Sequence, residues 1–285
     1  MKVTIRRGTP RDSAAIGRIC YEGFKALADE HGFAPDFPDA QSAAGFLGSL
    51  IDHPGYFGLV AEADGRIVGS NFVDERNAIS GVGPITVAPG TQNTGVGRAL
   101  MDAAIGRSED RGVPGLRLVQ AAYHRRSLAL YVKLGFDVRA ALVCLQGSAL
   151  RMAVPGCVVR PASQADLAAG DNLCRRVHGF ARTGELADAI SQGSARIVER
   201  AGRVTGYATA MAFFGHAVGE TNDDLRALIG AAEAYLGPGF LLPAGNGDLL
   251  RWCLAHGLRI TQPMTLMSKG LYQEPTGAWI PSVLY

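Results

Sequence analysis

The chain has 285 residues, of which 47% are hydrophobic and 19% charged, and its net charge is +2. This length suits one large domain or two domains of about 140 residues each, and the composition is that of an ordinary soluble protein. The small net charge argues against a nucleic-acid surface as the main function. No apolar run approaches the roughly 18 residues needed to span a bilayer, and the first residues lack the apolar segment of a signal peptide. We therefore expect a cytoplasmic protein with neither nucleic acid nor a membrane as a partner.

The predicted elements of the first half form a mixed α/β pattern. In chain order they are a strand at 3–7, helices over 9–30 and within 39–51, a hairpin over 56–73, a strand at 83–89, a helix over 95–112, a strand at 115–122, a helix over 125–135 and a closing pair of strands within 136–154. The hairpin is indicated by the Asp64-Gly65 turn between two strand-like runs. The order βααβββαβαββ predicts a twisted mixed sheet with helices on both faces.

Three segments of the first half recur in the same order in the second half. They are IRRGTPRD (5–12) with VRPASQAD (159–166), GRIVG (65–69) with GRVTG (202–206), and HRRSLALYVKLGF (124–136) with NGDLLRWCLAHGL (246–258). The offset between matched positions falls at the second match and again at the third, so the second copy is shorter in both intervals. This pattern predicts an internal duplication, with domains at 1–153 and 157–285.

The five cysteines have scattered spacings and form no CxxC pair. They are Cys20, Cys144, Cys157, Cys174 and Cys253. The odd number and the expected reducing compartment favour free thiols, most of them in the core. No metal site is predicted.

A glycine-rich stretch, PITVAPGTQNTGVGRALMDAA (84–104), lies between the second and third matches, where the second copy is shorter. Gly95 and Gly97 allow a second molecule to approach the main chain. The start of the following helix offers unpaired N–H groups and a positive dipole end, a combination that favours phosphate. Two familiar phosphate loops fit poorly, because a Walker loop needs Lys where Arg98 stands and a dinucleotide fingerprint needs Gly or Ala where Leu100 stands.

Two motifs resemble the signatures of the GNAT acetyltransferase superfamily. The first, Q/R-x-x-G-x-G/A after a strand and at the start of a helix, matches Gln92 to Gly97. The second, N-x-x-[SA]-x-x-L-Y-x-K-x-G-F, is matched by His124, Ser127, Leu130, Tyr131, Lys133, Gly135 and Phe136, with His124 in place of the Asn. The resemblance covers residues 1 to about 153, and tandem arrangements with one degenerate copy are also known in this superfamily. It implies two tandem GNAT-like acyl-CoA N-acyltransferase domains, the second degenerate.

The resemblance also implies an acetyl-CoA site. The loop amides would hold the pyrophosphate, and the free edge of the preceding strand would pair with pantetheine. The implied cofactor-binding residues are Ile85, Thr86, Val87, Gln92, Asn93, Thr94, Gly95, Val96, Gly97, Arg98, His124, Ser127 and Tyr131. The alternative is a glycine-rich turn that holds no ligand, and His124 could equally face solvent.

Acetyl transfer from a thioester needs a neutral amine and a proton for the leaving thiolate. Tyr131 occupies the family's proton-donor position, although it could instead pack the helix against the sheet. The family's usual acid on the strand before the loop is absent, and Asp74 or Glu75 is the nearest candidate for the general base. The alternative for these two acids is a solvated turn in which Arg76 is their partner.

The predicted activity is therefore that of an N-acetyltransferase, acting by direct attack of a small-molecule or peptide amine on acetyl-CoA. The alternative is a non-catalytic acetyl-CoA sensor or regulatory module, and a homo-oligomer stays open. The C-terminal tail is strongly apolar and includes Trp279, Ile280, Leu284 and Tyr285, so we expect it to pack into a groove between the domains. In a sharper version the α-carboxylate of Tyr285 meets the acceptor amine.

Overall fold

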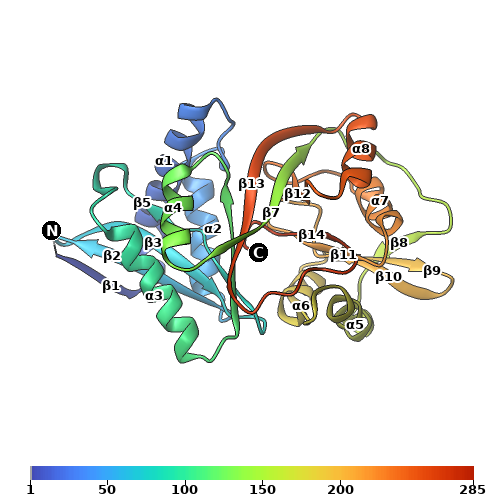
Figure 1. The fold of residues 1–285 in the computed structure, drawn as a ribbon, viewed down its shortest axis with the longest axis horizontal. Coiled ribbons are helices and arrows are strands. Elements are labelled where there is room, and N and C mark those ends of the chain that lie inside the picture. Colours follow the sequence, from blue (N-terminus) through green and yellow to red (C-terminus); the bar gives the residue numbers. More distant parts are fainter. Residues whose placement is uncertain (1) are drawn as a thin grey trace.

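The computed structural model describes residues 2–285 and contains two sheets flanked by helices (Figure 1). The elements of the first half are β1 Val3–Arg7, α1 Ser13–His31, α2 Ala40–Asp52, β2 Tyr56–Ala63, β3 Arg66–Asp74, β4 Ser80–Val82, β5 Thr86–Val87, α3 Val96–Asp110, β6 Gly115–Ala121, α4 Arg125–Lys133 and β7 Asp137–Gln146. Those of the second half are β8 Val158–Pro161, α5 Leu167–His178, α6 Thr183–Ser191, β9 Arg196–Arg200, β10 Arg203–Ala208, β11 Ala217–Gly219, α7 Asn222–Ala231, β12 Phe240–Pro243, α8 Gly247–Ala255, β13 Arg259–Gly270 and β14 Ala278–Ile280. Short 3₁₀ turns precede α1, α3 and α5, at Pro10–Asp12, Pro89–Thr91 and Gln164–Asp166.

The predicted hairpin forms β2 and β3. Asp64 and Gly65 both have left-handed backbone angles, with φ of 50° and 72°. Two successive residues with positive φ match the right-handed twist of the flanking strands, which is why an Asp-Gly pair closes such a hairpin. The antiparallel register runs from Tyr56 opposite Asp74 to Ala63 opposite Arg66.

The first half buries both faces of its sheet. Val60 and Phe72 pack under α1 and α2, in a cluster that also contains Ile16 and Leu47. Their neighbours Leu59, Ala61 and Val73 point to the opposite face and pack under α3. Because successive side chains of a strand point to opposite faces, near-continuous apolar strands indicate a sheet with helices on both sides. The predicted mixed α/β class is confirmed.

The internal duplication is visible in matching side-chain contacts. In the first half Arg6 holds Asp12 with two hydrogen bonds of 2.8 Å and also contacts Glu62. In the second half Arg160 makes the same contacts with Asp166 and Glu199. The guanidinium of Arg6 lowers the pKa of Asp12 to about 2. Each ion-pair cluster joins the first strand of its half to the first helical turn and the second strand.

The two halves exchange their last long strands. The central sheet has the order β1-β2-β3-β4-β6-β13-β7-β12, so β13 of the second half lies between β6 and β7 of the first half. In return, β7 lies between β13 and β12 of the second half (Figure 1). The predicted closing pair of strands within 136–154 is therefore wrong. Residues 147–157 form no strand, and the partner that β7 would have had from its own half is supplied by β13.

The apolar tail is buried between the two halves, as predicted. Trp279, Ile280, Leu284 and Tyr285 are at most 8% exposed. β14 pairs antiparallel with β11, so that Trp279 lies opposite Val218. Beyond β14, Leu284 joins the apolar cluster beneath α1 and α2 of the first half. The tail therefore adds a strand to the second half and then crosses to the first.

All five cysteines are free, and four of them are buried. Within residues 2–285 no helix is both long enough and apolar enough to cross a membrane. The predicted boundary between residues 153 and 157 falls in the segment that joins β7 to β8. That segment links the halves in sequence, whereas β7 and β13 link them in the sheet.

Because β7 and β13 belong to both halves, we expect the two halves to unfold together. Leu142 of β7 is 1% exposed and lies opposite Met264 on one side and Pro243 on the other. Leu142→Ala should lower the free energy of unfolding by about 2–5 kcal/mol. Fluorescence of Trp252 and Trp279, both in the second half, and hydrogen exchange of β2 and β3 should report the same loss.

Val138→Ala is the matched control, since Val138 lies on the same strand and is 54% exposed. It should change the free energy of unfolding by less than about 0.5 kcal/mol. Two separate unfolding transitions, with only one of them moved by Leu142→Ala, would contradict the shared-strand account.

Candidate active site

The sheet of the first half opens into a wedge beside β6. β4 pairs with β6 in parallel at Ser80 opposite Leu116 and Gly81 opposite Arg117. β5 then pairs with β3 only. From residue 83 onward the chain therefore diverges from β6, and the edge of Ile85–Val87 that faces β6 has no strand partner within the described chain. Such an edge presents backbone N–H and C=O groups to whatever enters the wedge.

The loop after β5 presents a run of free amides at the start of α3. Gly95 has a left-handed φ of 93°, and α3 begins at the next residue, Val96. No hydrogen bond to residues 2–285 takes up the backbone N–H of any residue from Gln92 to Arg98; the first loop amide to be used is that of Ala99, which donates to Gly95. Unpaired amides at a helix N-terminus, together with its dipole, form an anion site.

These amides border a surface hollow, which we call the outer hollow. Its walls carry two basic side chains, Arg98 and Arg126, beside the free edge of β5. The lining residues are Ile85, Val87, Gln92, Asn93, Gly95, Gly97, Arg98, His124, Arg126, Ser127, Leu130 and Tyr131. The structure thus brings most of the predicted cofactor-binding residues to one place.

Three predicted cofactor-binding residues do not line the outer hollow. Thr86 faces the cavity behind it. The Thr94 hydroxyl donates to the carbonyl oxygen of Thr91 at 2.6 Å, and the Val96 side chain is buried in the core beneath α3. Arg126 was not predicted, although a basic residue in the first turn of a helix beside a phosphate loop is a signal that the sequence contains.

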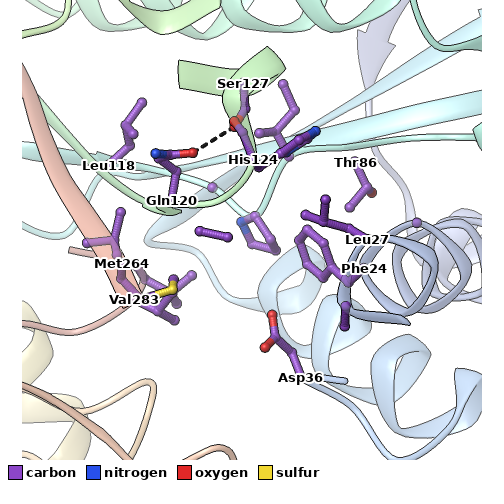
Figure 2. Close-up of a pocket in the computed structure, with 18 of the residues that line it drawn as sticks. Phe24, Leu27, Asp36, Thr86, Leu118, Gln120, His124, Ser127, Met264 and Val283 are labelled. Carbon is purple, nitrogen blue, oxygen red and sulfur yellow. Dashed lines mark hydrogen bonds between the residues drawn. The ribbon is translucent and has the colours of Figure 1, made fainter. Parts of the chain in front are cut away.

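His124 and Ser127 lie at the start of α4, between the outer hollow and the cavity behind it. The Ser127 hydroxyl lies 2.8 Å from Oε1 of Gln120 and 2.9 Å from the carbonyl oxygen of His124 (Figure 2). Burial lowers the pKa of His124, so its imidazole is neutral at pH 7. His124 therefore faces the site rather than bulk solvent.

Tyr131 lines both spaces. Its ring is 5% exposed and packs 6.3 Å from that of Phe136, so the packing role is present. Its hydroxyl has no hydrogen-bond partner among residues 2–285. Burial raises the pKa of Tyr131, which keeps the phenol protonated at neutral pH.

A second space, which we call the inner cavity, continues inward from the wedge and has a volume of about 150 Å³. The first half contributes α1, the loop before α2, β5 and the end of β6. The second half contributes Phe213, Phe214, Gln262, Met264, Val283 and Leu284. The strand exchange explains this shared wall, because β13 brings Gln262 and Met264 beside the end of β6, where Met264 pairs with Ala121.

The two expected bases lie elsewhere. Asp74 is held by Arg76 through contacts of 2.6 and 2.9 Å. Glu75 is held by Arg107 at 2.7 Å and by Arg111 at 3.1 Å. Neither acid lines the outer hollow or the inner cavity. The alternative in which Arg76 is the partner fits Asp74, except that Asp74 is 6% exposed rather than solvated.

The inner cavity instead contains Asp36, which the sequence analysis missed. Asp36 lies in the segment FAPDFP between α1 and α2, and it is the sole acidic residue that lines either space in the described chain. An acid set among aromatic residues and prolines is a usable signal. Tyr285 does not line the cavity, and its main-chain oxygen accepts a hydrogen bond from Arg182. In residues 2–285 no group of three or more His, Cys, Asp or Glu side chains is arranged to hold a metal ion.

Comparisons with known proteins agree with this geometry. Residues 22–136 match the model of the acetyltransferase (GNAT) family. An 88-residue segment is 32% identical to a mycothiol acetyltransferase of Streptomyces avermitilis, and it covers 30% of this chain but only 28% of that enzyme.

Two solved structures resemble nearly the whole chain in fold. A candidate acetyltransferase from Pyrococcus horikoshii has a TM-score of 0.73 at 18% identity, over 97% of this chain and 92% of its own. A GCN5-related N-acetyltransferase from Sphaerobacter thermophilus has a TM-score of 0.63 at 15% identity, over 95% and 96%. The two-sheet architecture is therefore shared with other proteins.

The ion pairs of Glu75 lead to a test of its role. Glu75→Gln should lower the free energy of unfolding by about 1–2 kcal/mol, because Arg107 and Arg111 lose their carboxylate partner. The catalytic rate should stay within about twofold, since Glu75 lies outside both spaces. The measurements are urea denaturation and an enzyme assay, with Glu109→Gln, exposed on α3, as the matched control. A large fall in rate for a fully folded Glu75→Gln protein would restore Glu75 as the base.

Proposed function

Because the chain belongs to the GNAT acetyltransferase superfamily through residues 22–136, we propose that it transfers an acetyl group from acetyl-CoA to a primary amine by direct attack in a ternary complex. The observation that carries this proposal is the run of unpartnered amides from Gln92 to Arg98 beside the open edge of β5. The second half acts as a degenerate copy whose role is to complete the acceptor cavity.

The outer hollow fits coenzyme A in charge and shape. The loop amides and the N-terminus of α3 would bind the pyrophosphate, with Arg98 and Arg126 adding positive charge. The unpaired edge of Ile85–Val87 would hydrogen-bond the amides of pantetheine as an added strand does. Acetyl-CoA supplies the activated thioester, and the wedge directs its acetyl end toward the inner cavity.

The two spaces share the residues at which two substrates would meet. His124, Ser127 and Tyr131 line both of them. Among the described residues neither space is lined by a cysteine, which supports direct attack by the amine over transfer through an enzyme thioester. Tyr131, protonated at neutral pH, would donate its proton to the leaving thiolate.

The second half lacks the features that would hold coenzyme A. β11 corresponds to β4 when the two GRxxG hairpins are aligned, but its free edge is taken by β14. Helix α7 begins soon after β11, and its cap Thr221 already satisfies Asp224 in a capping box. The tail therefore occupies the position that pantetheine would take in the first half.

Gly97→Glu tests the cofactor site. The added carboxylate should repel the pyrophosphate, and calorimetry should detect no acetyl-CoA binding. Gly106→Glu is the matched control, because Gly106 lies further along the same helix with no atom within 4 Å of an added Cβ. It should bind acetyl-CoA like the parent. Equal affinity in Gly97→Glu and the parent would show that the loop is not the coenzyme A site.

Tyr131→Phe tests the proton donor. Removing the hydroxyl while keeping the ring against Phe136 should lower kcat by about 10²–10⁴-fold, the usual range for general-acid catalysis. Acetyl-CoA affinity should change little, and steady-state kinetics with calorimetry measures both. A variant with the parent kcat would remove the donor role. Acetyl-CoA binding without acetylation of any amine by the parent protein would instead favour the sensor alternative.

A further inference from the structure

We infer that the acceptor is a primary amine with an apolar body, and that Asp36 binds its ammonium group and accepts its proton. The inference rests on the proposed acetyltransferase function and assigns the base that the strand before the loop lacks. It depends on three observations: the isolation of the Asp36 carboxylate, the absence of positive charge around it, and the apolar walls of the inner cavity.

The Asp36 carboxylate points into the inner cavity, toward the space bordered by Phe24, Met264 and Val283 (Figure 2). Its recorded hydrogen bond comes from Nε2 of Gln262, at 3.3 Å. No lysine, arginine or histidine of residues 2–285 forms a salt bridge with it. Carboxylates that are removed from water are normally paired with a cation, so the structure contains an acid that lacks a cationic partner.

The titratable groups around Asp36 are neutral at pH 7. They are Cys20 on α1, Tyr123 after β6 and Cys144 on β7, and burial raises the pKa of each. His124, on the far wall, has a pKa lowered by burial. Burial also raises the pKa of Asp36 itself. A cationic ligand would reverse this effect, because a nearby positive charge favours the ionised carboxylate.

The walls around this acid are aromatic and aliphatic. Phe37, Phe46 and Phe214 form a group in which each pair of ring centroids lies within 6.3 Å. Phe46 and Phe214 keep part of their surface exposed, and that surface faces the cavity. A sugar or a polyamine would bury hydroxyl or ammonium groups here without partners, which is costly. One carboxylate and three phenyl rings instead match one charge and one apolar group.

The proposed step is balanced as follows. The ammonium of the acceptor transfers a proton to the Asp36 carboxylate, and the neutral nitrogen forms a bond to the carbonyl carbon of the thioester. The C–S bond breaks, the thiolate takes a proton from Tyr131, and the products are the N-acetyl amine and coenzyme A. The amide nitrogen loses its second proton to solvent, Asp36 releases its proton to solvent, and Tyr131 regains one from solvent.

The binding experiment uses calorimetry on the full chain loaded with coenzyme A, with 2-phenylethylamine and its uncharged analogue 2-phenylethanol as probes. Asp36→Asn should weaken the amine by tenfold or more and leave the alcohol within about twofold. Asp52→Asn, which removes an exposed acid at the end of α2, should change neither. Equal losses for amine and alcohol, or no loss of amine affinity, would overturn the assignment of Asp36.

A second variant tests the apolar body without altering the acid. Phe214→Ala should weaken 2-phenylethylamine by tenfold or more and leave ethanolamine unchanged, since ethanolamine has no ring to bury. The parent should bind 2-phenylethylamine at least tenfold more tightly than ethanolamine, because burying a phenyl group contributes more free energy than a tenfold change in affinity requires. An equal or reversed preference would overturn the substrate class.

The rate of acetyl transfer against pH tests proton acceptance. With Asp36→Asn, reaction depends on amine that is already neutral, so kcat/KM should rise close to tenfold per pH unit below the pKa of the amine. The parent should depend on pH much less steeply. Identical profiles would overturn the role of Asp36 as base. If the parent binds the amine through Asp36 yet transfers no acetyl group, the proposed function and the base role fail together, while the amine site stands on the calorimetry.

Discussion

The pairing of β7 with β13 is the interaction on which the rest of the structure depends. Each strand lies beside the other half's sheet, so neither half can close its own sheet without the other. This pairing places Gln262 and Met264 beside the end of β6, and it brings the loop with Phe213 and Phe214 to the mouth of the wedge. The inner cavity therefore belongs to both halves. A single copy would leave the wedge open to water on the side where the acceptor must bind, and desolvation of the reacting groups would be lost.

The two copies of the fold use the same wedge in opposite ways. In the first, the edge beyond β4 is open and a loop of free amides follows it. In the second, the chain is shorter at this point and β14 covers the corresponding edge. A strand and a pantetheine chain satisfy the same backbone groups, so the tail is a permanent occupant of the second wedge. The same segment then sends Val283 and Leu284 into the wall of the first cavity, which couples the loss of one site to the completion of the other.

Local features were the predictable part of this structure. The Asp64-Gly65 hairpin, the glycine loop before α3 and the Arg6–Asp12 contact, repeated by Arg160 and Asp166, depend on residues close in sequence or on a clear repeat. The strand exchange was missed because β7 and β13 have the same pattern whichever sheet they join, and only long-range packing decides between them. Asp74 and Glu75 were expected in the cleft because Arg107 and Arg111, which hold Glu75, come from the far end of α3 and the turn after it, remote from Glu75 in sequence. Asp36 was missed for the same reason, since its surroundings come from α1, β6, β13 and the tail.

The central claim is that one continuous space, made by both halves, holds acetyl-CoA at its outer end and an amine at its inner end. The most direct test is a crystal structure of the full chain with coenzyme A and 2-phenylethylamine. The account predicts the pyrophosphate on the amides of Gln92 to Arg98, pantetheine along Ile85–Val87, and the ammonium at hydrogen-bond distance from Asp36, with the phenyl ring beside Phe214. Coenzyme A bound in the second half, or the amine bound outside the inner cavity, would contradict it.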